Sequence, residues 1–346
     1  MNLKEQLDSY VQEGLLDAIP NGPLTIYNYR MECQFSKSWN PQTLAARGLV
    51  LDQDGKIIAL PMKKFFNLGE MEHTKLENLP KETPELSEKY DGSMIIIFFD
   101  PYSNKWRAIT RGCWDNVQTQ FAYKWLESNT DKLFTDNTYI FELVAPWNRI
   151  VCHYSEEKMI LIGIIHTESG EDFSYQRVRS YAKSVGLEAV SVKVKPIDSI
   201  DQANPNITNE EGFVARFSNG LRVKIKYEAY KQLHKVMTGL STIGIWEGLS
   251  SGSKMDMENV PDEFMAWFNE EKLKMQSAFK NIDLACKGIF MARRENWSRK
   301  EAAQFFMRWP ENAGILFRML DGKPYEDLIW KQIRPEGKKV FKKDQA

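Results

Sequence analysis

The residues of this chain that are best suited to chemistry are Lys89-Tyr90-Asp91-Gly92-Ser93, which lie between a polar run and the apolar segment 94–99. The pattern predicts a lysine at the mouth of a β-hairpin, with Asp-Gly in the turn and a buried strand after it. A lysine amine held at the edge of a pocket becomes a nucleophile when cationic neighbours or desolvation lower its pKa. A solvated lysine beside an ordinary Asp-Gly turn fits the same five residues, so other charged residues must decide between the two interpretations.

Four further charged residues lie on or beside apolar strands. Lys224 and Lys226 are two residues apart, so on a strand both side chains leave from the same face. Lysines in this arrangement either pair with carboxylates or bind a phosphate. Glu142 and Glu211 adjoin apolar strands, where an unpaired carboxylate is costly. Carboxylates so placed commonly hold a metal ion, a ribose hydroxyl or a lysine.

The elements that must position these residues are mostly strands before residue 240. Asp54-Gly55 and Asn219-Gly220 each predict a tight hairpin. Helical patterns interrupt the strands at 117–128 and 175–185. Many antiparallel strands with few helices indicate an α+β domain. The expected strands are 48–51, 56–60, 94–99, 106–110, 139–144, 159–165, 212–217 and 221–225.

Strand signals stop after Ser241. Apolar residues at helical spacing occupy 261–279, Ser298 and Glu301 form a capping box, and another helix is expected at 324–333. We therefore expect two domains, 1–240 and an all-helical 241–346. Residues 287–346 carry 14 Lys and Arg against 8 Asp and Glu, although the whole chain has a net charge of -1. This excess suits an anionic partner, or simply a solvated helical face.

Composition narrows the class of protein. The chain has 346 residues, of which 42% are hydrophobic, and no apolar run approaches the length of a membrane helix. Its start lacks the pattern of a signal peptide. The four cysteines and four histidines show no metal-ligand spacing, so we interpret them as structural residues. A cytoplasmic protein without a membrane partner is expected.

The order of these motifs resembles a known superfamily. Lys89-x-Asp-Gly, Phe141-Glu142, Glu211-Gly-Phe-Val and Lys224-x-Lys226 are similar to motifs I, III, IV and V of the covalent nucleotidyltransferases, the polynucleotide ligases and mRNA-capping enzymes. The flanking Ala46-Arg47-Gly48, Lys64-Phe-Phe-Asn-Leu and Tyr230 resemble specifically the phage T4 RNA ligase 1 family, over about residues 45–230. The alternation of a β-rich OB domain does not follow motif V.

The resemblance implies an antiparallel-sheet-rich nucleotidyltransferase domain that joins RNA ends with ATP, through lysyl-AMP and RNA-adenylate. Its implied catalytic residues are Lys89, Lys224, Lys226 and Glu211. Its implied divalent ion, Mg²⁺ with Mn²⁺ as an alternative, is held by Glu211 and Glu142. The residues implied for the nucleotide are Arg47, Lys64, Phe66, Tyr90, Gly92, Arg111, Glu142 and Tyr230.

The resemblance also implies the partners. The expected substrate is RNA with 5′-phosphate and 3′-hydroxyl ends, including nicked tRNA, and the helical domain is expected to supply RNA specificity. A monomer in the cytoplasm of a phage-infected bacterium is expected. Two positions depart from the family pattern: Arg111 stands where the family has lysine, and Lys63 precedes the better-aligned Lys64. A capping-type guanylyltransferase that uses GTP and a catalytically inactive RNA-binding protein remain as alternatives.

Overall fold

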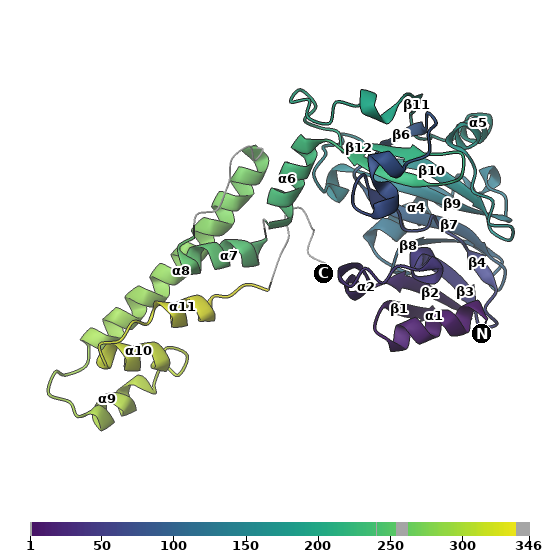
Figure 1. The fold of residues 1–346 in the computed structure, drawn as a ribbon. Helices are drawn as coiled ribbons and strands as arrows, with labels where there is room; N and C mark the ends of the chain where they lie inside the picture. Colours follow the sequence, from purple (N-terminus) through teal and green to yellow (C-terminus); the bar gives the residue numbers. More distant parts are fainter. Residues whose placement is uncertain (1, 240, 254–261, 337–346) are drawn as a thin grey trace. The chain divides into compact units, whose positions relative to one another are not determined.

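The computed structural model describes residues 2–239, 241–253 and 262–336, and the chain divides into two compact units, 1–231 and 232–346 (Figure 1). The division falls inside helix α6 (Glu228–Gly239), whereas the sequence analysis expected a boundary at 240. Each unit is described by itself below. In the described ranges, no helix combines the length and apolar character that a membrane span requires.

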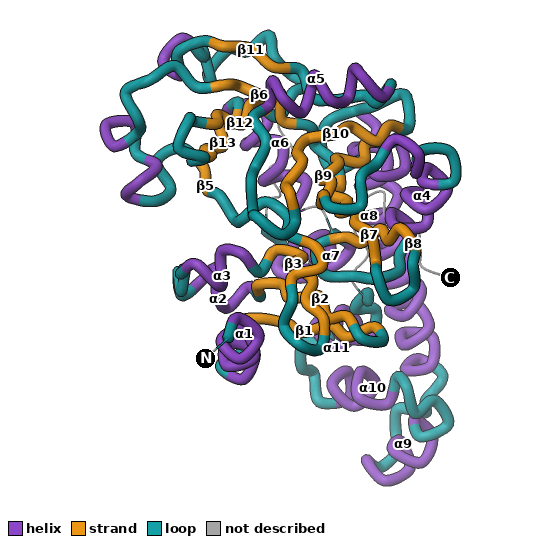
Figure 2. Tube along the Cα trace, turned by 90° about the vertical axis from the view of Figure 1, so that its right-hand side faces the viewer, coloured by secondary structure: helices purple, strands orange, loops and turns teal. Residues whose placement is uncertain are grey.

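The first unit is built on three sheets (Figure 2). We call them the N-terminal sheet (order β1-β2-β3-β4), the central sheet (β10-β9-β7-β8) and the lysine sheet (β11-β6-β12-β13-β5). Their strands are β1 Leu16–Asn21, β2 Leu24–Tyr29, β3 Arg47–Asp52, β4 Ile57–Ala59, β5 Phe66–Asn67, β6 Glu85–Lys89, β7 Ser93–Asp100, β8 Lys105–Thr110, β9 Asn137–Val144, β10 Lys158–His166, β11 Val192–Val194, β12 Gly212–Arg216 and β13 Arg222–Lys226. All pairs are antiparallel except β13 with β5.

The central sheet is covered on both faces. Ile95 and Ile97 face a core that includes helices α4 (Val117–Leu126) and α5 (Tyr175–Val185). On the opposite face, Ile96 packs against the N-terminal sheet and Val144 against Val214 of the lysine sheet. Because side chains alternate along a strand, Glu142 leaves β9 on the same face as Val144. The short helices α1 (Leu3–Gln12), α2 (Met31–Phe35) and α3 (Pro41–Ala45) accompany the N-terminal sheet.

The prediction of a hairpin around Asp91-Gly92 is wrong. β6 pairs with β11 and β12 in the lysine sheet, whereas β7 pairs with β8 and β9 in the central sheet. Residues 90–92 therefore cross from one sheet to the other. The physical reason is that their polar groups bind elsewhere: the Gly92 N–H donates to Glu142 (3.0 Å), and the Asp91 carboxylate accepts from Val151 and Cys152. The hairpins at Gly55 and Gly220, both with positive φ, are confirmed.

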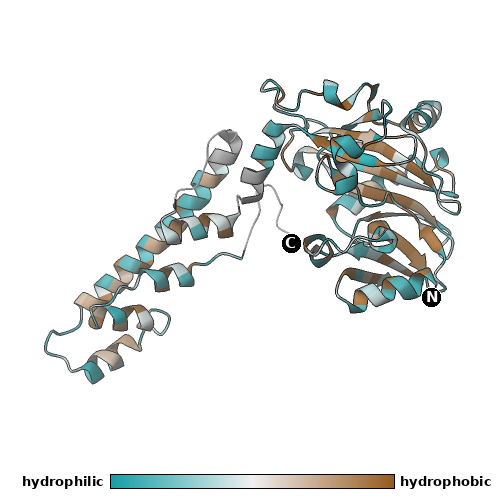
Figure 3. Ribbon diagram, viewed as in Figure 1, coloured by the Kyte–Doolittle hydropathy of each residue, from teal (hydrophilic) through white to brown (hydrophobic). Residues whose placement is uncertain are grey.

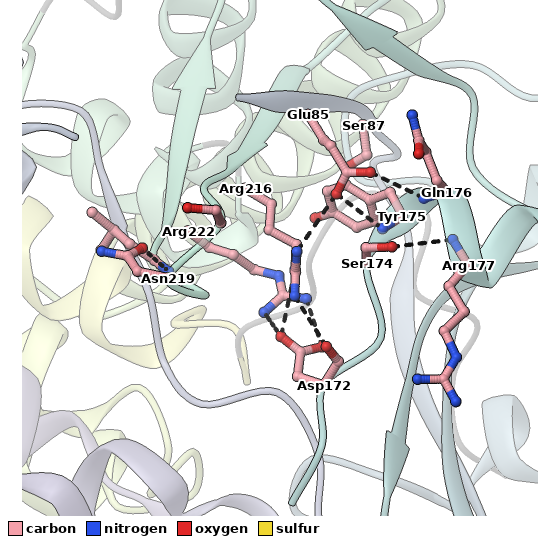
Figure 4. Close-up of polar contacts among 12 residues, drawn as sticks. Glu85, Ser87, Asp172, Ser174, Tyr175, Gln176, Arg177, Arg216, Asn219 and Arg222 are labelled. Atoms are coloured by element: carbon pink, nitrogen blue, oxygen red, sulfur yellow. Dashed lines mark hydrogen bonds and ion pairs between the residues drawn. The ribbon is translucent and has the colours of Figure 1, made fainter. Parts of the chain in front are cut away.

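A largely buried ionic cluster, with side chains 8–23% exposed, attaches helix α5 to the lysine sheet (Figure 4). Asp172, just before α5, accepts from both terminal nitrogens of Arg222 on β13, one at 2.9 Å. Arg216 on β12 lies 3.6 Å from the same carboxylate and 3.5 Å from Glu85. Glu85 accepts the first two amides of α5, Tyr175 and Gln176, at 3.1 Å. Arg222, Lys224 and Lys226 are two residues apart along β13, so their side chains leave the same face of the strand. The cluster therefore holds the strand that carries both lysines.

The named elements in the described part of the second unit are all helices. Its helices are α7 Thr242–Ser251, α8 Asp262–Met291, α9 Arg299–Phe306, α10 Ala313–Leu320 and α11 Glu326–Gln332. Helices α8 to α11 enclose a core that includes Cys286, Ala302, Phe306, Leu316 and Ile329. The predicted capping box is present, because Ser298 accepts from the Glu301 amide and Glu301 from Ser298. The expected α+β fold with a helical C-terminal part is confirmed, and hydropathy colouring shows the strands of the first unit as mostly apolar (Figure 3).

Candidate active site

Two of the predicted catalytic lysines lie side by side because of strand register. Gly212, at the start of β12, pairs with Lys89 on β6 and with Lys226 on β13. Its φ of +140° is one that side chains rarely adopt, and an added Cβ would lie 2.0 Å from the Ile225 carbonyl oxygen. Glycine at this position therefore lets the three strands meet with both lysines at their ends.

Glu211 joins these two lysines. The Lys89 Nζ lies 2.6 Å from Glu211 Oε2, and the Lys226 Nζ lies 2.8 Å from Oε1. The Glu211 side chain is 2% exposed, whereas the lysines are 21% and 22% exposed. A carboxylate this deeply buried requires positive partners. The structure thus gives the predicted Glu211 two ion pairs and orients the Lys89 amine toward it.

Lys224 has no such partner among the described residues. Burial, together with the charges of Lys64, Arg47, Lys89 and Lys226, lowers its pKa to about 6. Its Nζ lies 5.0 Å from the centre of the Phe65 ring, which Arg47 also faces at 5.6 Å. Burying several cations together without matching carboxylates is unfavourable unless an anion joins them. The region around Lys224 is therefore suited to a polyanionic ligand.

Glu142 contributes a carboxylate from the central sheet. Its Oε1 accepts the Gly92 N–H at 3.0 Å, which connects it directly to the Lys89 motif. The pKa of Glu142 is raised to about 7, mainly by desolvation; Lys89 opposes the rise and Glu211 contributes to it. The protein itself requires glycine at position 92, because an added Cβ would lie 2.2 Å from the Leu143 carbonyl oxygen.

Asp91 was not among the predicted site residues, and it holds the site's framework. The side chain is 3% exposed. Its Oδ2 accepts from the amides of Val151 (2.7 Å) and Cys152 (2.8 Å), and its Oδ1 accepts from the Tyr230 hydroxyl (2.7 Å). The only sequence signal was its place in Lys-x-Asp-Gly. Tyr230, predicted to touch the nucleotide, is placed by this bond at the base of the motif, with the Lys226 Nζ 5.0 Å from its ring.

Two more predicted cations lie around Tyr29. The Arg111 guanidinium donates to the Tyr29 hydroxyl at 2.7 Å and lies 4.8 Å from its ring centre. The Lys64 Nζ is 5.4–5.6 Å from the rings of Tyr29, Trp39 and Phe66. Aromatic faces attract cations without neutralising them. Both residues therefore keep their charge available for an anion. Lys63 is exposed, as expected for a solvent-facing neighbour.

The remaining predicted residues are aromatic. Phe66 is 3% exposed and packs against Trp39 and His73, with ring centres at 5.5 and 5.8 Å. It is the adjacent Phe65 that meets Arg47 and Lys224. Tyr90 is partly buried beside Tyr154, whose hydroxyl accepts the Asp91 N–H at 2.9 Å. Phe65, Tyr29 and Tyr154 were missed because aromatic residues give no sign in sequence of which face they occupy.

The carboxylates fit a divalent cation only together with a ligand. In the part of the chain that the structure describes, no group of three or more His, Cys, Asp or Glu is placed to hold a metal ion. Mg²⁺ typically binds through one or two carboxylates and takes its other ligands from substrate phosphates and water. Glu142 and Glu211 both act electrostatically on one another beside Lys89. The donor set therefore fits a cation that arrives with a phosphate-bearing substrate.

The site as a whole presents a nucleophilic amine and an excess of positive charge. Two carboxylates, Glu142 and Glu211, are accompanied by six basic side chains: Arg47, Lys64, Lys89, Arg111, Lys224 and Lys226. Such a set can bind a triphosphate, stabilise charge that develops on a phosphorus under attack, and capture that phosphorus on an amine.

Comparisons with known proteins agree with this chemistry. An RNA ligase from Rhodothermus phage RM378 is 24% identical over 96% of this chain and 89% of its own length. A putative RNA ligase from Thermovibrio ammonificans is 28% identical over 57% of this chain and 54% of its own length. An archaeal ATP-dependent RNA ligase has a similar fold, with a TM-score of 0.53 at 13% identity over 93% of this chain and 96% of its own. The pattern of the RNA ligase family, T4 RNA ligase 1 type, matches residues 45–230, so the chain belongs to that family.

Proposed function

We propose that this protein is an ATP-dependent RNA ligase that joins a 5′-phosphate to a 3′-hydroxyl through a covalent lysyl-AMP. The observation that carries the proposal is the arrangement of Lys89: its amine is 2.6 Å from the buried Glu211, and the unpaired Lys224 lies on the same face of the lysine sheet. A nucleophile and a lysine suited to binding phosphate are thus combined in one sheet.

In the first step the Lys89 Nζ attacks the α-phosphorus of ATP. An N–P bond forms, the bond between that phosphorus and the bridging oxygen breaks, and pyrophosphate leaves with the bonding electrons. The amine must lose a proton, for which Glu211 Oε2 is the nearest carboxylate oxygen. Lys224 and Lys226 stabilise the negative charge that builds up on the α-phosphate oxygens.

In the second step an oxygen of the RNA 5′-phosphate attacks the phosphorus of lysyl-AMP, and the N–P bond to Lys89 breaks. In the third step the 3′-hydroxyl of the other end attacks the activated 5′-phosphate, loses its proton and displaces AMP. The same cations serve each step, because in each one a phosphoryl group changes partner at the same place. The RNA product gains one phosphodiester bond and the enzyme returns to its starting state.

The remaining residues divide between the triphosphate, the nucleoside and a divalent ion. We assign the β- and γ-phosphates to the basic side chains near Tyr29, which are Arg47, Lys64 and Arg111. Glu142 is placed to accept from a ribose hydroxyl, and with Glu211 it would hold Mg²⁺ or Mn²⁺. When bound, the ion would neutralise phosphate charge and polarise the phosphorus. We assign Tyr90, Gly92, Phe66 and Tyr230 to shaping the nucleotide pocket, where Phe65 also lies.

The helical unit completes the proposal. Its basic end suits RNA, and we assign it to substrate choice, with nicked tRNA as one substrate and a monomer in the cytoplasm as the working form. We propose 1–240 as the catalytic domain and 241–346 as the helical domain, so that the boundary follows the end of α6. These assignments rest on charge and on the family.

The test is a pair of reactions. The protein is incubated with α-labelled ATP or GTP and Mg²⁺, and then with 5′-phosphorylated single-stranded RNA. We expect label on the protein from ATP and not from GTP, and circular RNA after the second incubation. Labelling by GTP would instead indicate a capping-type enzyme, and RNA binding without any label would indicate an inactive RNA-binding protein.

A further inference from the structure

The helical unit carries aromatic rings that its core does not absorb. Phe305 on α9 packs partly against the core, and its outer side meets two indole rings. Trp297 lies 5.2 Å from it and Trp309 lies 5.3 Å from it, both edge-on. Neither tryptophan belongs to the core cluster, and both are partly exposed. Large aromatic rings at a surface are enriched where another molecule binds.

One arginine adjoins these rings, and a second lies in the same turn as Trp297. The Arg308 guanidinium lies 5.5 Å from the centre of the Phe305 ring, and its side chain is exposed. The Trp297 N–H donates to the Arg294 carbonyl at 3.2 Å and closes a turn between these residues. The Arg294 side chain is exposed. We call Trp297, Phe305, Trp309, Arg294 and Arg308 the α9 surface; α9 itself is labelled in Figure 1.

The charges on this surface are unmatched, unlike others in the same unit. Lys274, Lys287 and Arg318 each lie within ion-pair distance of a carboxylate. Among the described residues, neither Arg294 nor Arg308 has one, although Glu295 and Glu311 are close in sequence. Surface cations with no carboxylate partner, next to aromatic faces, complement a ligand that has both negative charge and flat rings.

We infer that the α9 surface binds unpaired bases of the RNA substrate, with bases stacking on the tryptophans and phosphates meeting the arginines. This inference rests on the proposed RNA ligase function. Stacking on aromatic side chains and Arg is the usual way in which proteins hold unstacked RNA bases, whereas duplex RNA is bound mostly through its shape and phosphates. The combination of indoles with arginines therefore favours a loop or a single strand over a continuous duplex.

The test uses the full-length protein without ATP and measures binding of a fluorescent RNA hairpin with an unpaired loop. Trp309→Ala should weaken binding about tenfold because it removes the ring on which one base stacks, and Arg308→Ala should weaken it about tenfold because it removes one phosphate contact. Lys274→Ala, which removes a paired cation from the same unit, should change binding less than twofold. Trp309→Phe keeps a stacking ring and should recover most of the affinity, which separates a lost ring from a misfolded unit.

Salt dependence separates the two kinds of contact. Arg308→Ala should flatten the dependence of log affinity on log salt by roughly the 0.7 expected for one phosphate on a single strand, and Trp309→Ala should leave the slope unchanged. Wild-type affinity in both variants would overturn the inference, as would an equal loss on a blunt duplex without a loop. Labelling of Lys89 by ATP should be normal in every variant; its absence in the wild-type protein would refute the ligase function instead.

Discussion

The three lysines of this site have two different environments. Lys89 and Lys226 share the buried Glu211, whereas Lys224 is buried among cations and has no carboxylate partner in the described residues. Their roles follow from this difference. The lysine beside a carboxylate can lose its proton and attack, and the unpaired lysine is the one whose charge an incoming phosphate can restore.

Substitution of the nucleophile should abolish the covalent step. Lys89→Ala should give no AMP adduct while the protein remains folded, because Lys89 is the last residue of β6 and its side chain is partly exposed. Lys63→Ala is the matched control: this lysine is exposed, so labelling should stay within about twofold of wild type. Gel detection of labelled protein checks both. Any adduct on the Lys89 variant would place the nucleophile elsewhere.

Binding of a triphosphate should take up a proton. The pKa of Lys224 is about 6 in the free protein, so at pH 8 it is mostly neutral. Phosphate charge beside it raises that pKa, so the amine gains a proton when ATP binds, and affinity should fall as pH rises above 6. Calorimetry in buffers with different ionisation enthalpies measures the uptake. Lys224→Met should remove it, and equal uptake by this variant would assign the proton to another group, such as Glu142.

The order of the motifs along the sequence predicted which charged residues meet at the candidate site, but not which other groups these residues contact. Lys89, Glu211, Lys224 and Lys226 come together as the motifs predicted, because strand alternation and register fix their faces. Asp91 was missed as an anchor, since nothing in the sequence indicates that Val151, Cys152 and Tyr230 meet it. Phe65, not Phe66, contacts Arg47 and Lys224. The sequence could not predict this, because a strand of two residues is too short for its pattern to indicate which side chain faces the site.

At the scale of elements, local turn chemistry predicted two hairpins correctly and one wrongly. Asn219-Gly220 joins adjacent strands, and its side chain and glycine close the turn locally. Asp91-Gly92 has the same chemistry, yet its side chain and amide are bound by distant segments, so the chain changes sheets. Tertiary contacts with buried polar groups outweigh a turn preference of about 1 kcal/mol. This change of sheet is what places Glu142 beside the lysine motif.

The ionic cluster that attaches α5 to β13 should matter for stability and for catalysis. Asp172→Ala leaves Arg222, 8% exposed, and Arg216, 10% exposed, without their shared carboxylate. Removing one partner of a buried pair typically costs about 3–5 kcal/mol. Urea unfolding should show a loss of about 3 kcal/mol, and labelling should slow because β13 carries Lys224 and Lys226.

Glu171→Ala is the control for this prediction. It removes the neighbouring carboxylate, whose pair with Arg177 is more than half exposed on both sides, so stability should change by less than about 1 kcal/mol. Equal unfolding midpoints for the two variants would show that the cluster does not secure the sheet.

At the scale of the whole molecule, the proposal gives the chemistry to the first unit and the choice of RNA to the second. Every predicted site residue lies at or before Tyr230, and the division of the chain falls just after it, within α6. Helix α6 therefore belongs to the catalytic unit at its start, because the Tyr230 hydroxyl donates to Asp91. Where the chain is cut should decide whether the lysine still reacts.

We expect a chain that ends at Gly239 to keep self-adenylylation, because it retains α6 and the bond from Tyr230 to Asp91. A chain that ends at Tyr227 should lose it, since the buried Asp91 carboxylate then lacks one of its three donors and a hydrogen bond to a charged group contributes about 1.5–3 kcal/mol. Full-length Tyr230→Phe should show a similar but smaller loss.

The chain ending at Gly239 should also lose its preference for folded RNA over a simple strand. Its difference from the full-length protein should shrink as salt screens the basic helical unit. Competition binding at several salt concentrations checks this, and an unchanged preference in the shortened chain would place RNA choice in the catalytic unit.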